Sequence, residues 1–231
     1  MQTYRIADLL VNMDVHGRTA VQAEIYKTDN TDKPEITVTL NLNKTVNEGD
    51  FSPSDVEYMD SCSVFYRQLL CFNGLLLHSS AVVMDGRAYL FSASSGTGKS
   101  THTRLWQQVF GADRAQIIND DKPALRQIDG VWYAYGTPWS GKSTTSLNLR
   151  VPIAGICFLK QGKTNEIRKI SAADAAFRVL EQTIRPKNSI LTAMLLESVD
   201  KLVSQVETYE MQCNMEPEAA MLSYQTMSAG T

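Results

Sequence analysis

The segment that most constrains the fold is residues 75–105, LLLHSSAVVMDGRAYLFSASSGTGKSTHTRL. It opens with an apolar run, Leu75–Met84, and a second apolar run follows Asp85-Gly86, which is the pattern of two strands joined by a tight turn. The second strand leads into a glycine loop, defined here as residues 93–98, and a helix-compatible segment, Thr101–Phe110, comes next. The pattern therefore predicts a strand, a glycine loop and a helix in direct succession.

The residue types of this loop suit the binding of phosphate groups. Gly96 and Gly98 let the backbone turn so that several N–H groups point inward, and the helix N-terminus adds partial positive charge. Lys99 can reach the outer phosphates of a nucleotide, and the Ser100 hydroxyl can ligate Mg²⁺. The residues expected to contact the nucleotide are Ser94, Ser95, Gly96, Thr97, Gly98, Lys99, Ser100 and Thr101.

Ala93 departs from this pattern, because it stands where the first glycine is usual. An alanine there requires a backbone with negative φ or slight crowding. The alternative interpretation is a Gly/Ser-rich turn that precedes a helix by accident. The strand before the loop and the helix after it favour the phosphate-binding interpretation.

Two carboxylates, Asp120 and Asp121, end a short apolar strand that begins at Ala115. A nucleotide enzyme places its metal ligand and its base at such a position. Adjacent carboxylates at a strand end face different ways, so one can hold Mg²⁺ while the other addresses an attacking hydroxyl. The alternative is that the pair caps a turn before Lys122-Pro123.

The chain before the glycine loop is predicted to form a β element over residues 1–46, followed by a helix. Strands are expected at Tyr4–Ile6, Ala20–Tyr26 and Ile36–Leu42, and no residue of this element is expected to carry chemistry. Asn47–Asp50 is a polar loop. Ser52 is a good N-cap for a helix over about residues 53–72.

After the carboxylate pair, a hairpin turns at Asp129-Gly130 and leads to a second loop, Gly136–Ser143. Trp139 and Lys142 of this loop suit contact with substrate or phosphate. The alternative interpretation is that the loop is an exposed turn without a function. The remaining elements are expected to be strands at Leu147–Arg150, Ala154–Leu159 and Thr208–Asn214, and helices from Ser171 to Arg185, from Ile190 to Val206 and from Pro217. No linker or internal repeat interrupts the chain, so residues 1–231 are expected to form one domain with a core at 75–214.

Composition and charge make several classes of binding partner unfavourable. The net charge is −3 and the pI about 5.7, so electrostatics do not favour nucleic acid or an anionic membrane. No apolar run reaches the roughly 18–20 residues that a membrane span needs. The N-terminus does not resemble a signal peptide, and the four cysteines include no CxxC pair. A reduced, cytoplasmic location is the expectation.

The chain resembles the HPr kinase/phosphorylase catalytic domain and, more distantly, ATP-dependent phosphoenolpyruvate carboxykinases. The likeness spans roughly Leu77–Val199, and its most specific features are Leu77-His78 and the Ser95–Ser100 and Ile118–Asp121 segments. Leu147–Arg150 and Arg185–Asn188 match more loosely. The resemblance implies a single α/β phosphate-loop domain with a mixed, mainly antiparallel sheet, flanking helices and an N-terminal β element.

The resemblance also implies roles for individual residues. Lys99 and Ser100 would bind ATP phosphates and Mg²⁺, Asp120 would assist the metal, and Asp121 would be the general base. His78 would lie near the transferred phosphate, although the residues alone favour a buried strand histidine. Arg150 would contact phosphate or substrate. Asn148 replaces the glutamate of the family signature, which puts a phosphorylase half-reaction in doubt.

These observations favour a Mg²⁺/ATP-dependent kinase that acts on a hydroxyl. The first alternative is an ATP-binding regulatory or sensor protein with little turnover, motivated by Ala93 and Asn148; the second is a carboxykinase-like lyase. The acceptor stays open among a protein serine, a peptide and a small molecule. Assembly into a homo-oligomer also stays open.

Overall fold

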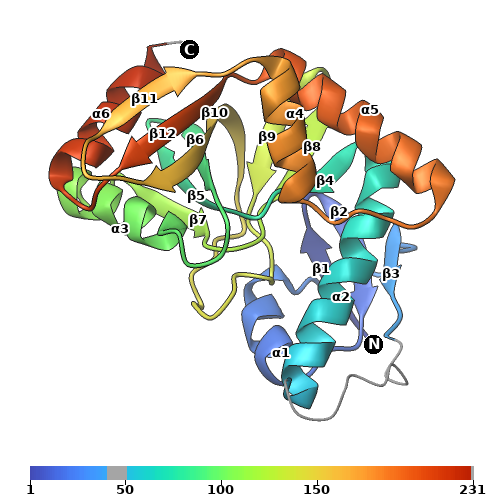
Figure 1. Ribbon diagram of the computed structural model, residues 1–231. Coiled ribbons are helices and arrows are strands. Elements are labelled where there is room, and N and C mark those ends of the chain that lie inside the picture. Colours follow the sequence, from blue (N-terminus) through green and yellow to red (C-terminus); the bar gives the residue numbers. More distant parts are fainter. Residues whose placement is uncertain (41–50, 230–231) are drawn as a thin grey trace.

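A computed structural model of the chain describes residues 1–40 and 51–229. These residues form a large sheet with helices on its faces and a smaller N-terminal sheet beside it (Figure 1). The helices are α1 Gly17–Ala23, α2 Pro53–Leu69, α3 Lys99–Phe110, α4 Ala172–Glu181, α5 Ser189–Gln205 and α6 Pro217–Ser228, with 3₁₀ turns at Glu24–Tyr26 and Leu70–Phe72. The strands are β1 Gln2–Ile6, β2 Leu9–Met13, β3 Ile36–Val38, β4 Gly74–Leu76, β5 Ser79–Met84, β6 Arg87–Ser92, β7 Gln116–Asn119, β8 Ala124–Ile128, β9 Val131–Tyr135, β10 Arg150–Gln161, β11 Glu166–Lys169 and β12 Thr208–Cys213.

The large sheet is mixed and mainly antiparallel, as predicted. Among the described residues it has the order β4-β8-β9-β10-β6-β5-β7, and β12 pairs with both β10 and β11. The pairings of β10 with β6 and with β12 are parallel, and the others are antiparallel. The first residues of β10 pair with β9 and its later residues with β12. This long strand therefore joins the two halves of the sheet.

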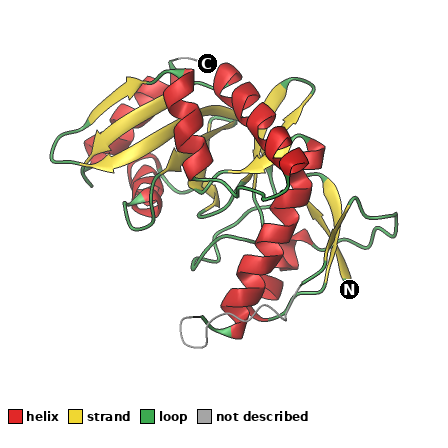
Figure 2. Cartoon of the chain, turned by 45° about the vertical axis from the view of Figure 1, so that its right-hand side comes forward, coloured by secondary structure: helices red, strands yellow, loops and turns green. Residues whose placement is uncertain are grey.

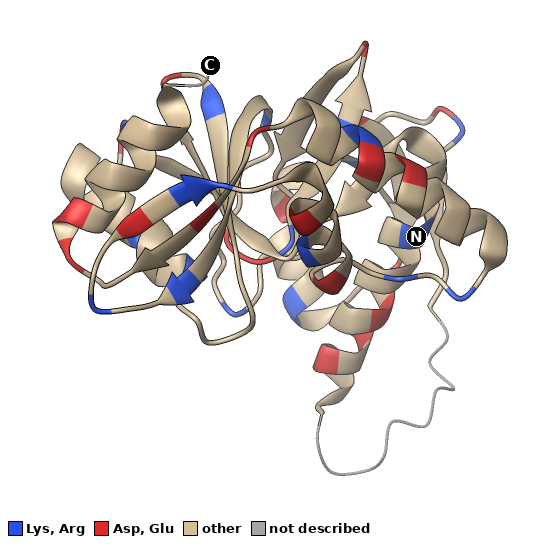
Figure 3. Ribbon diagram, turned by 45° about the horizontal axis from the view of Figure 1, so that its top comes forward, with Lys and Arg blue, Asp and Glu red and all other residues tan. Residues whose placement is uncertain are grey.

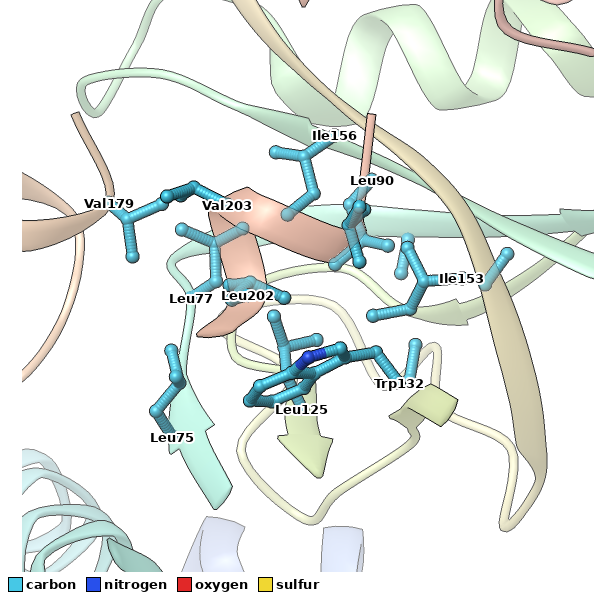
Figure 4. Close-up of a cluster of buried hydrophobic side chains, with 14 of the residues drawn as sticks. Leu75, Leu77, Leu90, Leu125, Trp132, Ile153, Ile156, Val179, Leu202 and Val203 are labelled. Carbon is cyan, nitrogen blue, oxygen red and sulfur yellow. The ribbon is translucent and has the colours of Figure 1, made fainter. Parts of the chain in front are cut away.

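Helices cover both faces of the half of the sheet that contains β6, β10 and β12 (Figures 1 and 2). On one face, α4 and α5 bury Val179, Leu195 and Leu202 against Leu90 and Ile156 (Figure 4). On the other face, α3 and α6 pack against alternate residues of the same strands, because successive side chains of a strand point to opposite faces. α3 is thereby fixed directly on the sheet from which the glycine loop emerges.

The N-terminal element differs from the prediction in one segment. Ala20–Tyr26 is not a strand: α1 and the following 3₁₀ turn occupy it. Thr19, Gln22, Ala23 and Tyr26 are the buried residues, and their spacing of three and four is helical. β1, β2 and β3 form the sheet, so the predicted strand at Ile36–Leu42 holds over its first residues, and residues 41–50 lie outside the described part of the chain.

The predicted helix after this element is confirmed, together with its cap. The Ser52 side chain accepts a hydrogen bond from the Asp55 N–H, and the Asp55 side chain accepts one from the Ser52 N–H, which is a capping box. Pro53 takes the first helical position. α2 then buries Phe65 and Tyr66 in a cluster that also contains residues of β1, β2, β3, β4 and β9.

Three other predicted boundaries change. Leu75–Met84 is two strands, because the chain leaves the sheet at His78, whose N–H donates to the carbonyl of Gln182 at 2.8 Å. Leu147–Leu149 is not a strand; Leu147 and Leu149 are exposed, and β10 starts only at Arg150. α4 stops at Glu181 instead of Arg185, and β11 lies in a segment for which no strand is predicted.

The distribution of charged residues and the state of the cysteines agree with what the composition predicts. Lys and Arg are interspersed with Asp and Glu along the ribbon in the view of Figure 3. The four cysteines are free, with Cys71 exposed. Among the described residues, no helix is both long and apolar enough to cross a membrane.

Candidate functional site

The glycine loop connects β6 to α3 and turns as its glycines predict. Gly96 has φ +80° and Gly98 φ +114°, a backbone region that residues with a Cβ rarely adopt. Gly98 is the N-cap of α3 and supplies no capping side chain. The N–H groups of the first helical turn are therefore available to an anion. Ala93 is buried and is not among the positive-φ residues, so it satisfies the backbone condition set for it.

The Lys99 side chain folds back over this loop. Its Nζ donates to the carbonyl of Ala93 at 2.8 Å and lies 3.4 Å from that of Ser94. Burial lowers the pKa of Lys99, whereas the nearby charges of Asp121 and Asp120 act in the opposite direction. The charges of both carboxylates thus favour the protonated form of the Lys99 ammonium group. An anion bound in the loop could take the place of the carbonyl groups that now accept from Lys99.

Asp120 follows β7 and is buried beside the first turns of α3. Its Oδ1 accepts a hydrogen bond from Ser80 Oγ at 2.7 Å, and Ser80 in turn lies 2.8 Å from Thr103 Oγ1 of α3. Arg104 Nη2 is 3.4 Å from the other carboxylate oxygen. These contacts fix Asp120 on the α3 side of the carboxylate pair.

Asp121 faces a different set of partners, as expected for adjacent residues at a strand end. His78 Nε2 is 3.0 Å from its Oδ1, and Lys122 forms an ion pair with its Oδ2. The Tyr58 hydroxyl donates to Oδ2 at 3.4 Å. Burial opposes ionisation, but the hydrogen bond from His78 and the charge of Lys122 outweigh it and lower the pKa of Asp121 to about 2. Asp121 is therefore a carboxylate at neutral pH.

His78 is held between two acceptors. Its Nδ1 is 3.1 Å from Gln182 Oε1, and its Nε2 faces Asp121. The ring therefore has a polar partner on each of its two nitrogens. Gln182 and Asp121 together fix the ring orientation. The histidine lies at the site and is partly exposed, so the interpretation as a simple buried strand residue is wrong.

The second loop, residues 136–143, lies beside Asp121, but not through the side chain predicted for it. A Cβ placed on Gly141 would lie 3.0 Å from the Cβ of Asp121, and the Gly141 N–H donates to the Tyr58 hydroxyl at 2.7 Å. Lys142 is exposed, and its charge contributes to lowering the pKa of Asp55. The backbone of the second loop at Gly141 therefore lies next to the Asp121 carboxylate, whereas the Lys142 side chain is exposed.

Two predicted contact residues must be corrected. Trp139 is completely buried, and its indole Nε1 donates to Ser61 Oγ at 3.1 Å, so its side chain has no surface to offer a substrate. Arg150 pairs with Asp8 at 3.0 Å at the start of β10, whereas the glycine loop lies at the opposite end of that strand, where Gln161 bonds to Thr97. Arg150 therefore belongs to the contact between β10 and the N-terminal element.

Several residues at the site carried no usable signal in the sequence. Tyr58 and Gln182 come from distant helical segments, and Ser80 and Arg104 reach Asp120 only through the fold. Lys122 follows Asp121 directly and could have been proposed from that adjacency. The described residues contain no cluster of three or more His, Cys, Asp or Glu side chains arranged to hold a metal.

Comparison with known proteins places the chain in a family. The family model described as "SynChlorMet cassette protein ScmC" matches residues 47–228. The chain belongs to the ScmC family. No curated protein matches its sequence.

One similar solved structure is the HPr(Ser) kinase/phosphatase from Coxiella burnetii, at 9% sequence identity and a TM-score of 0.40. The match covers 67% of this chain and 95% of that chain. A likeness of this degree says nothing about activity.

Proposed function

We propose that this protein is a Mg²⁺/ATP-dependent phosphotransferase that moves the γ-phosphoryl group of ATP to a hydroxyl. The observation that carries the proposal is the meeting of three features: the glycine loop with Gly96 and Gly98 in the left-handed region, Lys99 at the start of α3, and the pair Asp120 and Asp121 at the end of β7. The contacts of Asp120 with Ser80 and with Arg104 of α3, the helix that Lys99 begins, support a single site.

The residues present fit a magnesium nucleotide. Ser100 and Asp120 would hold the metal, and residues 94–101 would bind the phosphates through backbone N–H groups, hydroxyls and Lys99. Mg²⁺ is usually bound by one or two carboxylates together with phosphate oxygens and water, so a site without a three-ligand protein cluster suits it. The metal would neutralise negative charge on the outer phosphates.

Asp121 is suited to orient the acceptor hydroxyl. Because its pKa is about 2, it is ionised at neutral pH and can accept a hydrogen bond from that hydroxyl. A carboxylate of low basicity takes the proton late, which is compatible with a transfer that depends mainly on positioning and electrostatics. Lys122 and His78 both contact Asp121, and the Lys122 ammonium would place positive charge near the transferred group.

The experiment uses purified protein, Mg²⁺ and γ-labelled ATP, with and without cell extract depleted of small molecules. Label in a protein or peptide band identifies a protein or peptide acceptor, and label that moves only when the small-molecule fraction is restored identifies a metabolite acceptor. Lys99→Ala should lower transfer by about 10²–10³-fold, the typical loss for one charge-stabilising group. Asp121→Asn should keep ATP binding and lose transfer.

Matched controls are Lys201→Ala and Asp113→Asn, which change exposed residues outside the site. Normal transfer by Asp121→Asn would remove the role of Asp121. Tight ATP binding without transfer to any fraction would refute the phosphotransferase and favour a nucleotide-binding regulator. Absence of ATP binding would refute both.

A further inference from the structure

A cavity lies beside the glycine loop, on the side of α3 away from the carboxylate pair. Its volume is about 440 Å³, within the range of about 300–1,000 Å³ typical of ligand pockets. It is lined by the loop, by α3 and by the ends of β10 and β12: Gly96, Thr97, Gly98, Thr101, His102, Leu105, Leu159, Gln161, Gly162, Cys213, Asn214 and Met215. No residue of the carboxylate site is among them.

The helical repeat separates the two sites. Thr103 and Arg104 contact Ser80 and Asp120 on one side of α3. Each residue of a helix is rotated by about 100° from the one before it, so Thr101 points about 160° away from Thr103, which bonds to Ser80, and Leu105, four residues after Thr101, lies on the same side of the helix as Thr101. A ligand whose phosphates occupy the glycine loop would therefore extend from the carboxylates at one end to this cavity at the other.

The cavity wall contains no Lys, Arg, Asp or Glu side chain, and part of it is apolar. Leu105 and Leu159 are buried in the core cluster between α3 and β10, and Cys213 is partly buried against it. Met215 is 75% exposed at the same cavity, an unusual position for a large apolar side chain. A thioether adapts to the face of a flat ring, so Met215 is suited to cover one.

His102 adds a buried polar group that lacks a partner. The Ser223 hydroxyl donates to the carbonyl of Ala220 and accepts from Trp106, each at 3.0 Å, so His102 Nε2 must donate to it. The other ring nitrogen, Nδ1, has no hydrogen-bond partner within the described residues. Burial lowers the pKa of His102 to about 4, so the ring is neutral and Nδ1 is an acceptor at neutral pH.

Two further polar side chains of the wall are engaged in hydrogen bonds. Gln161 Nε2 donates to the carbonyl of Thr97 at 3.2 Å. Asn214 accepts from the N–H of Glu216 at 3.0 Å and donates to the carbonyl of Lys163 at 3.3 Å. The wall also carries the hydroxyls of Thr97 and Thr101, which can either donate or accept and therefore suit the edges of adenine and guanine alike.

We infer that this cavity binds the purine base of the nucleoside triphosphate, and that it accepts adenine and guanine alike. The inference rests on the proposed function, because it assumes that the phosphates lie in the glycine loop. Its distinguishing feature is that the base contributes to affinity through apolar contact, including contact with Met215.

Isothermal titration in the presence of Mg²⁺ tests this with ATP, GTP and inorganic tripolyphosphate. ATP should bind at least about tenfold more tightly than tripolyphosphate, equivalent to 1.4 kcal/mol, and GTP within about tenfold of ATP. Met215→Gln should weaken ATP and GTP several-fold and leave tripolyphosphate unchanged. Met221→Gln, which changes another exposed methionine, on α6, is the matched control.

A second measurement does not depend on that variant. In a Cys71→Ser background, ATP should protect Cys213 from alkylation and tripolyphosphate should not, because only the nucleotide would fill the cavity. Equal binding of ATP and tripolyphosphate, both lost in Lys99→Ala, would overturn the base site and leave the proposed function standing. A preference of more than about a hundredfold between ATP and GTP would overturn the shared acceptance of purines. Failure of both ATP and tripolyphosphate to bind would refute the proposed function itself.

Discussion

Replacing Asp121 by asparagine should destabilise the protein by an amount that depends on pH. The folded protein lowers the pKa of Asp121 from 3.8 to about 2, so the fold favours the ionised form. At 1.36 kcal/mol for each pH unit, this drop corresponds to about 2 kcal/mol of folding stability. Asparagine cannot supply the negative charge, and it leaves Lys122, whose side chain is 23% exposed, without its ion-pair partner.

The sign of the pH dependence follows from the lowered pKa. The contribution of Asp121 is complete above the unfolded pKa of 3.8 and is lost as the pH falls through about 2. The difference in unfolding free energy between the wild type and Asp121→Asn should therefore be about 2 kcal/mol at pH 7 and at pH 5, and about half of that at pH 3. Other carboxylates titrate in both proteins and cancel in the difference.

Urea unfolding followed by tryptophan fluorescence at these three pH values measures the difference. Asp113→Asn, in an exposed turn, is the control and should show no pH-dependent gap. A gap that is equally large at pH 3 and pH 7 would show that the loss comes from packing and not from charge. A gap below about 0.5 kcal/mol at pH 7, the size of an ordinary surface substitution, would refute the ion-pair argument altogether.

Four further substitutions test other parts of the structure. Gly98→Ala forces a Cβ into φ +114°, and should cost about 1–3 kcal/mol of stability and abolish ATP binding by titration. Trp139→Phe should lower the unfolding free energy by about 1–3 kcal/mol through lost packing and a lost hydrogen bond, yet leave the KM for ATP unchanged. Arg150→Ala should leave phosphoryl transfer unchanged, because the side chain lies away from the glycine loop. Gln22→Ala removes hydrogen bonds to the carbonyls of Gly141 and Ser143 and should speed amide hydrogen exchange in the second loop, whereas Gln68→Ala should not.

Local patterns predicted the glycine loop and its surroundings well, because each part depends on residues close in sequence. The Asp85-Gly86 turn has φ +52° and +75° as such a hairpin requires, and α3 ends at Gly111 with φ +89°. The starts of α2 and α4 after the capping residues Ser52 and Ser171, and the start of α6 at Pro217, were likewise predictable. The two carboxylates at the end of β7 follow from the same local logic.

The secondary-structure prediction was wrong where a segment fits both the strand and the helix repeat, and the prediction of exposure was wrong where contacts with distant segments bury a loop residue. Ala20–Tyr26 alternates apolar and polar residues and also satisfies a helical spacing, and only contact with α2 and the N-terminal sheet selects the helix. Trp139 stands in a polar, glycine-containing loop, which suggested exposure. Its ring instead packs against Phe65 at a centroid distance of 4.8 Å, a contact between segments far apart in sequence. The pattern of residues in one sequence does not show which distant segments come into contact.

The surroundings of Asp121 show why the N-terminal element matters although no chemistry was expected there. The Tyr58 hydroxyl accepts from the Gly141 N–H and donates to Asp121, and Gln22 of α1 bonds to the carbonyls of Gly141 and Ser143 at 3.1 and 2.9 Å. The second loop is therefore held against the carboxylate by α1 and α2.

The two ends of the proposed nucleotide site are thus built by different parts of the chain. The base cavity uses α3, β10 and β12, whereas the side of Asp121 open to an acceptor is bounded by the second loop, α1 and α2. On the proposed function, changes in α1 or in the exposed face of α2 can alter which hydroxyl reaches Asp121 while the phosphate and base contacts stay intact. If the protein is a phosphotransferase as proposed, acceptor choice and ATP affinity should therefore vary independently, and substitutions in α1 and α2 should change the first without the second.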